Sequence, residues 1–152
     1  MRGLAAAYKV LINAKRLALS RNARLGEVIF LGIGCADCHL PAMRTGPNEV
    51  AALDGVEFFP FSDFLVHDMG RLNDGIVQVP AGIVQLPVAG QGMRTAPLWG
   101  ARIRTSFLHD GRAKTIEDAI FAHDGQGLTA RNQFADLNKR EKANLLAFIN
   151  TL

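Results

Sequence analysis

Residues 35–39 read Cys-Ala-Asp-Cys-His and contain both cysteines of this 152-residue chain. The pattern C-x-x-C-H is typical of covalent haem attachment, in which two thiols form thioethers with the two vinyl groups of one porphyrin. The histidine after the second cysteine then lies where an imidazole nitrogen can ligate the iron. We therefore predict that Cys35 and Cys38 anchor one covalently bound haem c (iron) and that His39 is its proximal ligand. A chain with this motif has to fold around a large planar cofactor.

Three other interpretations of the motif are open. A redox disulfide also uses C-x-x-C, but it normally stands between a strand and a helix, whereas the segment before Cys35 has a helical pattern. Zinc needs four ligands in a tetrahedron, which the adjacent Cys38 and His39 suit poorly, and no second cysteine pair is present. A chance match is the third, because short motifs recur without function.

Composition favours one globular unit with many loops. A chain of this length is most simply one domain, and its aliphatic content is too high for global disorder. The 15 Gly and 6 Pro residues indicate a loop-rich fold. No apolar run reaches the roughly 18 residues that a membrane span needs.

Charge is distributed unevenly along the chain. The net charge is +3, and six basic residues precede Glu27, the first acidic one: Arg2, Lys9, Lys15, Arg16, Arg21 and Arg24. This basic end fits solvent, an anionic membrane surface or an acidic redox partner protein. Nothing besides this charge suggests nucleic acid as a partner.

The N-terminus is not an evident signal peptide, because Lys9, Lys15 and Arg16 interrupt the apolar segment that one requires. Haem c is nevertheless attached outside the cytoplasm. We therefore expect a periplasmic or otherwise extracytoplasmic location.

Helical periodicity marks both ends of the chain. Residues 4–19 form an amphipathic pattern, and Ser20 or Asn22 is placed to cap a second helix that ends near Leu31. A C-terminal helix is predicted over residues 135–152, packed on the N-terminal helical region.

Between the ends, Thr115 is placed to cap a helix over residues 116–122, and a short helix is predicted from Pro97. Residues 75–88 contain two similar segments with alternating Ile and Val, which predict a short β-ribbon. The four phenylalanines between residues 58 and 64 are interpreted as packing residues.

The chain resembles the C-terminal haem domain of the bacterial di-haem oxidoreductase family, often labelled thiol oxidoreductase-like. It is more distantly similar to bacterial di-haem cytochrome c peroxidases. The matching blocks are Gly32-Ile-Gly-Cys-Ala-Asp-Cys-His-Leu-Pro41, Phe61-Ser-Asp-Phe-Leu-Val-His-Asp-Met-Gly70, Met93-Arg-Thr-Ala-Pro-Leu-Trp-Gly100, Arg104-Thr-Ser-Phe-Leu-His-Asp-Gly-Arg112 and Thr115-Ile-Glu-Asp-Ala-Ile-Phe-Ala-His-Asp-Gly125. Family members carry two haems, whereas this chain has one C-x-x-C-H motif. The resemblance thus implies the electron-transfer half, with a second haem domain or subunit as a possible partner.

The sixth iron ligand is open among several residues. In the peroxidase relatives it follows the helix after the His-Asp-Gly turn, and His123 matches that position. We therefore favour His123 as the sixth ligand, with Met69 and Met93 as the alternatives; the structural alternative for His123 is a helix C-cap. His67 and His109 lie in matching blocks and are interpreted as structural.

Arginines are the natural partners of haem propionates. Arg94 is the first candidate for this role, with Arg104 and Arg112 behind it. The alternative for each of these three arginines is an exposed position on the surface without a propionate partner.

The sequence therefore predicts a mostly α, cytochrome c-like helical domain around one haem, with residues 1–24 as a basic helical extension and residues 25–152 as the haem domain. Its expected function is electron transfer. The alternative is a peroxidase-like oxidoreductase with an open sixth site, for which His67, His109 or Glu57 would be the acid–base candidates.

Overall fold

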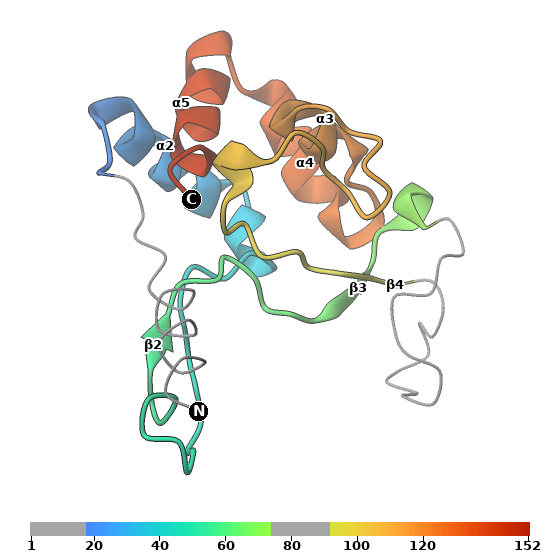
Figure 1. The fold of residues 1–152 in the computed structure, drawn as a ribbon. Coiled ribbons are helices and arrows are strands. Elements are labelled where there is room, and N and C mark those ends of the chain that lie inside the picture. The colour runs from blue at the N-terminus through green and yellow to red at the C-terminus, as the bar shows by residue number, and fades with distance from the viewer. Residues whose placement is uncertain (1–17, 74–91) are drawn as a thin grey trace.

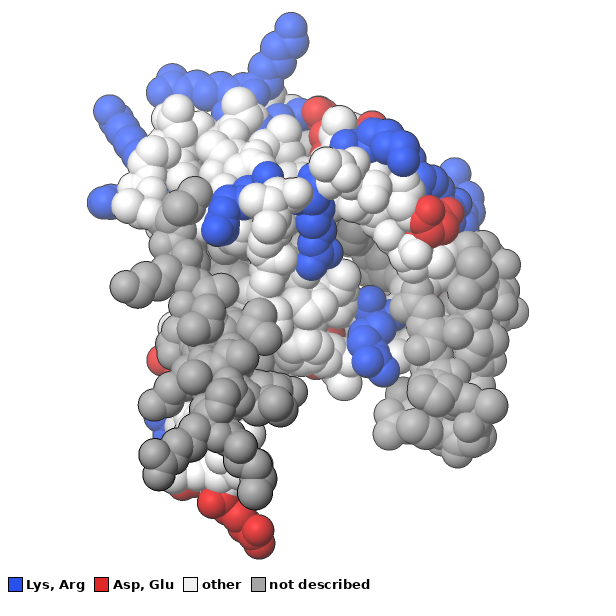
Figure 2. All heavy atoms as spheres, viewed as in Figure 1, with Lys and Arg blue, Asp and Glu red and all other residues white. Residues whose placement is uncertain are grey.

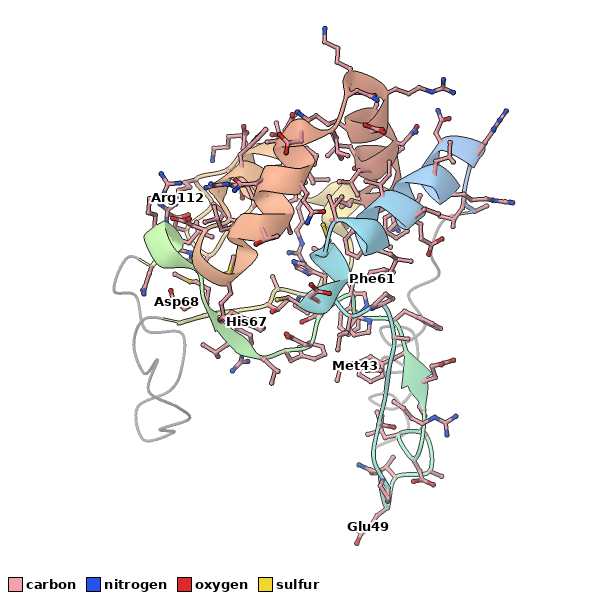
Figure 3. All side chains as sticks on the ribbon, turned by 180° about the vertical axis from the view of Figure 1, so that it is seen from behind. Met43, Glu49, Phe61, His67, Asp68 and Arg112 are labelled. Carbon is pink, nitrogen blue, oxygen red and sulfur yellow. The ribbon has the colours of Figure 1, made fainter. Side chains whose placement is uncertain are left out.

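The computed structural model describes residues 18–73 and 92–152. Within these ranges the chain forms four α-helices and two small antiparallel sheets of two strands each. The helices gather at one end of the molecule. The hairpin of strands β1, Met43–Arg44, and β2, Glu57–Phe58, extends away from them, with Glu49 near its tip (Figures 1 and 3). The predicted helix over residues 4–19 and the β-ribbon over residues 75–88 lie outside the described residues, apart from the last two positions of that helix.

Helix α2, Arg21–Gly32, begins as the sequence predicts. Ser20 is its N-cap, and the Ser20 hydroxyl accepts a hydrogen bond from the Ala23 amide at 3.2 Å. Such a cap satisfies one of the amides that have no partner in the first turn. The helix ends three residues before Cys35, so its last turn leads directly into the motif.

Helix α3, Ile116–Ala122, also matches its predicted bounds. Thr115 caps it, and the Asp118 carboxylate accepts a hydrogen bond from the Thr115 amide, which completes a capping box. Helix α3 ends at His123, whose amide bonds to the Ile120 carbonyl.

The C-terminal prediction was wrong in one respect. Two helices, α4 at Leu128–Asp136 and α5 at Lys139–Ile149, replace the single helix predicted over residues 135–152. Asn138 causes the break, because its side chain caps α5, and the Glu141 carboxylate accepts a hydrogen bond from the Asn138 amide.

The helix predicted from Pro97 is also absent. The described chain there has a turn and then a short 3₁₀ helix, η3, at Ala101–Ile103. Gly100, at φ 66°, precedes it. An α-helix through this left-handed residue would be interrupted.

The main core forms where α5 packs on α2, as predicted and as Figure 1 shows. The two helices approach most closely at Gly26, because a Cβ there would lie 2.8 Å from the Phe148 Cβ and still closer to the Asn144 carbonyl. The buried residues of this core are Phe30, Ile33, Phe61, Ala101, Phe134, Leu145, Phe148, Ile149 and Leu152. A second, smaller cluster contains Met69, Leu72 and Met93.

The two sheets join segments that are distant in sequence. Strand β1, Met43–Arg44, pairs with β2, Glu57–Phe58, and strand β3, Val66–Asp68, pairs with β4, Gly92–Arg94. In the second sheet His67 lies opposite Met93. No described helix has the length and apolar character that crossing a membrane requires.

Candidate functional site

The cysteine motif begins two residues after Ile33, the C-cap of α2. Gly34 adopts φ 84°, a left-handed conformation that favours glycine, and turns the chain into the 3₁₀ helix η1, Cys35–Asp37. The His39 amide then bonds to the Cys35 carbonyl at 2.9 Å. This tight turn brings both cysteines and His39 to one place in the fold.

His39 is held by a backbone carbonyl. Its Nδ1 lies 2.9 Å from the Phe61 oxygen, and because a carbonyl only accepts, Nδ1 carries the hydrogen of this bond. Nε2 of the neutral ring then has a free lone pair. Burial lowers the pKa of His39 to about 4, although the bond to Phe61 works in the opposite direction. The imidazole is therefore neutral at pH 7, which is the form that ligates a metal.

Phe61 provides this carbonyl from an unusual backbone. Its φ is 50°, in the left-handed region that non-glycine residues rarely enter. The Phe61 ring is 1% exposed and packs edge-on against Phe30 and Phe148. Packing of the ring thus compensates for the strained conformation that directs the carbonyl at His39.

His123 has the same hydrogen-bond arrangement as His39. Its Nδ1 donates to the Ala119 carbonyl, one turn back in α3, at 2.7 Å. Burial lowers the pKa of His123, with the Ala119 and Ile120 backbone groups acting against it. A second neutral imidazole with an available Nε2 therefore stands at the end of α3.

The rings of His39 and His123 lie close together, with centroids 6.4 Å apart and an angle of 50° between their planes. A metal–imidazole bond is about 2 Å long, and the ring centre lies about 1 Å further on, so two imidazoles on one ion have centres about 6 Å apart. The observed separation fits two axial ligands of one iron. The fold thus brings together two residues that are 84 positions apart in sequence.

Both cysteines are free in the described structure. Burial is the main cause that raises the pKa of Cys35 to about 12. Burial, followed by the Asp63 and Asp37 charges, also raises the pKa of Cys38. A raised pKa means that little thiolate is present at pH 7, so each thiol by itself is a weaker nucleophile than an exposed cysteine.

A group of ligand atoms from Cys38, Asp63 and His67 lies within 4.8 Å of one another. His67 Nε2 bonds to the Asp63 carboxylate at 2.8 Å, and the Asp63 amide bonds to the Cys38 carbonyl at 2.8 Å. Because Cys38 belongs to the haem motif, this group is part of the same site. His67 and Asp63 support the motif from the side of β3, where Figure 3 shows His67.

The other predicted ligands lie around His123 or on β4. The Met69 methyl group is 2.9 Å from the point where a Cβ on Gly127 would stand, and the His123 Cβ is 3.2 Å from that point. Met93 is buried on β4 in the same cluster as Met69. Whether one of these sulfurs or His123 ligates the iron stays a prediction.

The arginines differ in their surroundings. Arg94 is exposed on β4, opposite Val66. Arg104 donates to the Pro97 and Trp99 carbonyls, and Arg112 forms an ion pair with Asp110 at 2.6 Å. The predicted propionate role of Arg94 stays a prediction.

Sequence reasoning missed the groups that hold the His123 turn. Asp124 accepts from Arg71 Nε at 2.7 Å, and Arg131 donates to the His123 carbonyl at 3.2 Å. The sequence His123-Asp124-Gly125 was the available signal, since an Asp in such a turn commonly bonds to nearby backbone or charged groups.

The chain was also compared with known proteins. The sequence model of the family described as "Di-haem oxidoreductase, putative peroxidase" matches residues 5–152. No curated protein and no solved structure matches the chain significantly. Since the family match covers nearly the whole chain, the chain belongs to the di-haem oxidoreductase family, which its sequence blocks resemble.

Proposed function

We propose that this chain is a monohaem c-type cytochrome domain that transfers electrons. One haem c would be bound through Cys35 and Cys38, with His39 and His123 as axial ligands. The observation that carries the proposal is the pair of neutral imidazoles with centroids 6.4 Å apart, each with Nδ1 bonded to a backbone carbonyl. The membership of a di-haem family supports the cofactor, and the chain supplies one attachment motif.

The haem, when bound, supplies one-electron chemistry at its iron. The protein's part is to hold the two imidazoles at a fixed separation and to exclude water from the space around them. The Phe61 and Ala119 carbonyls keep each Nδ1 protonated, which leaves the Nε2 lone pair of each ring as the one that could ligate iron. Ligation by two histidines generally gives a lower reduction potential than ligation by histidine and methionine.

The partner and location follow as parts of the same proposal. Lys and Arg side chains lie along the helical end of the face in Figure 2, with few Asp or Glu among them. This distribution supports a redox partner protein with an acidic surface. A second haem domain or subunit would be a further electron partner, and attachment of haem c would place the chain outside the cytoplasm.

The test is the visible spectrum of the haem-loaded protein, ferric and ferrous, before and after carbon monoxide is added. We expect a low-spin, six-coordinate spectrum that carbon monoxide changes only slowly, because it can bind only while an axial ligand is dissociated. His123→Ala should become high-spin and bind carbon monoxide, whereas Met69→Leu and Met93→Leu should keep the wild-type spectrum. If Met69→Leu or Met93→Leu is the variant that opens the iron, the assignment of His123 is wrong.

A peroxidase is the second candidate function, because the family description names that activity. It would require a sixth position that is open or opens on reduction, with an acid–base residue beside it. His67 is bonded to Asp63 and so is the oriented candidate, ahead of His109 and Glu57. Ready carbon monoxide binding by the wild-type protein, together with peroxide turnover that is lost in His67→Ala, would favour this function.

A further inference from the structure

The turn after α3 is fastened to the rest of the site by one arginine. Arg131 extends from the first half of α4 back to the end of α3, where its Nη1 donates to the His123 carbonyl at 3.2 Å. The Arg131 side chain is 18% exposed, so most of its length is packed against protein. A mostly buried guanidinium in this position acts on the backbone of His123 itself.

The guanidinium is itself held in place. Its Nε and Nη2 donate to the Asn132 side-chain oxygen at 3.2 and 3.1 Å. The Asp124 carboxylate lies 3.8 Å from Nη1 and balances its charge. Because Asn132 and Asp124 both hold the planar guanidinium, its third contact, to the His123 carbonyl, has a defined direction.

Asp124 connects this arrangement to the 3₁₀ helix η2, Gly70–Leu72. Its carboxylate accepts from the Arg71 side chain at 2.7 Å and from the Arg71 amide at 3.3 Å. The Gln126 side chain accepts from the Asp68 amide at 2.8 Å. Figure 3 shows Asp68 leading into η2, beneath α3 and α4. The turn that carries His123 is thereby attached to α4 on one side and to β3 and η2 on the other.

We propose that Arg131 is the positioning residue for His123: its guanidinium, braced by Asn132 and Asp124, fixes the His123 backbone so that the imidazole stays beside that of His39. The inference rests on the proposed function, in which His123 is an axial ligand. Arg131 would touch neither the iron nor a substrate. Its effect is on the fraction of time that His123 is away from the iron.

The experiment measures the rate of carbon monoxide binding to the ferrous, haem-loaded protein, since carbon monoxide can bind only while His123 is dissociated. We expect Arg131→Met to bind about tenfold faster than the wild type, because a hydrogen bond from a charged donor is lost. Arg131→Lys, which keeps the charge, should lie between the two. Arg140→Met is the matched control, since it removes an exposed arginine in the first turn of α5, and it should bind at the wild-type rate.

Added imidazole separates positioning from general unfolding. It should restore the low-spin spectrum of Arg131→Met and slow its carbon monoxide binding. An Arg131→Met protein with the wild-type rate overturns the proposal, as does an equal acceleration in Arg140→Met. If Arg131→Met takes up no haem, Asp124→Asn replaces it, with about threefold acceleration expected, and an unchanged rate again overturns the proposal.

Failure of the proposed function gives different results. A wild-type protein that takes up no covalent haem, or a His123→Ala variant that stays six-coordinate, contradicts the function or its ligand assignment. If the haem-loaded wild type and Arg131→Met bind carbon monoxide at the same rate, only the role of Arg131 is contradicted.

Discussion

At the scale of single residues, the proximal side of the site depends on the loop that contains Phe61. Phe61 is buried, has φ 50° and offers its carbonyl to His39. Ser62, which has no exposed surface, donates to the Thr95 carbonyl at 2.8 Å and accepts from the Phe64 amide. These bonds tie the loop to the residue that follows β4 and to the chain that leads toward β3, and so help to hold the Phe61 carbonyl in place beside His39.

Asp63 makes this loop sensitive to acid. Burial works to raise its pKa, but hydrogen bonds from the Leu65 amide, the Thr95 side chain and His67 outweigh burial, and the pKa of Asp63 lies below its ordinary value. A carboxyl whose pKa is lower in the folded state stabilises the fold above its unfolded pKa of about 3.9 and loses that contribution as the pH falls through its folded pKa.

We therefore expect Asp63→Asn to lower the free energy of unfolding at pH 7 by about 1–3 kcal/mol and to flatten its dependence on pH below about 4. Urea unfolding at pH 7 and at a series of acid values measures both effects. Asp136→Asn, at an exposed position at the end of α4, is the control. Equal acid dependence in Asp63→Asn and the wild type would contradict the role of Asp63.

At the scale of elements, the contact of α2 and α5 determines where the motif begins. Glycine is the only residue type that fits at position 26. An added Cβ would overlap the Asn144 carbonyl oxygen and lie 2.5 Å from the Asn144 carbonyl carbon. The motif follows directly after α2, so a change in this contact displaces Cys35 as well.

We expect Gly26→Ala to cost about 3 kcal/mol or more, because backbone cannot move away as a flexible side chain can. Gly32→Ala is a matched control on the same helix, since a Cβ there meets nothing within 4 Å, and alanine favours helix over glycine by up to about 1 kcal/mol. Thermal unfolding of the two variants compares them. If Gly26→Ala unfolds near the wild-type temperature, α2 and α5 can move apart without loss of stability, and the prediction is wrong.

The 3₁₀ turn η4, Gly125–Gly127, is a second element whose spacing matters. A Cβ on Gly127 would lie 2.9 Å from the Met69 methyl and 3.2 Å from the His123 Cβ and Cδ2 atoms. Gly127 has an ordinary φ of −84°, so alanine would act through space alone.

We expect Gly127→Ala to shift the haem spectrum toward high spin by displacing His123. The double variant Gly127→Ala with Met69→Ala should recover part of the low-spin form, because it removes the methyl group that blocks the new Cβ. Spectra of the single and double variants at one temperature decide this. If the double variant stays as high-spin as Gly127→Ala, the new Cβ clashes with His123 and not with Met69.

At the scale of the whole molecule, the buried apolar residues of the described ranges form two clusters. The larger joins α2, α5 and Phe61, and the smaller joins Met69, Leu72 and Met93. His39 contacts the ring of Phe30 in the first cluster, while His123 follows Ala122, which packs on the second. A cofactor held by both histidines would therefore connect the two.

Removal of the attachment sites tests this connection. We expect Cys35→Ala with Cys38→Ala to carry no covalent haem and to unfold at a temperature lower by at least several degrees, since a ligand that binds only the folded chain stabilises it. Differential scanning calorimetry measures the shift, and a haem assay should give one haem per wild-type chain. The same unfolding temperature with and without haem would contradict a structural role for the cofactor.

The local features of the fold could be predicted from sequence. Ser20 and Thr115 cap the helices that they were expected to cap, because an N-cap needs only a side-chain oxygen and the amides two or three residues later. Asn138 and Glu141 carried the same signal for α5, which the apolar periodicity across residues 135–152 obscured. The family, too, was recognisable from contiguous blocks of sequence.

The residues of the haem motif and the list of possible ligands were thus determined by the sequence alone. Only the tertiary structure decided that His123 lies beside His39, that Phe61 adopts φ 50° to bond His39, and that Arg131 and Asp124 hold the His123 turn. Each of these depends on contacts between distant segments, such as the packing of the Phe61 ring against Phe30 and Phe148. Such contacts form only when the whole core closes, and no local pattern encodes them.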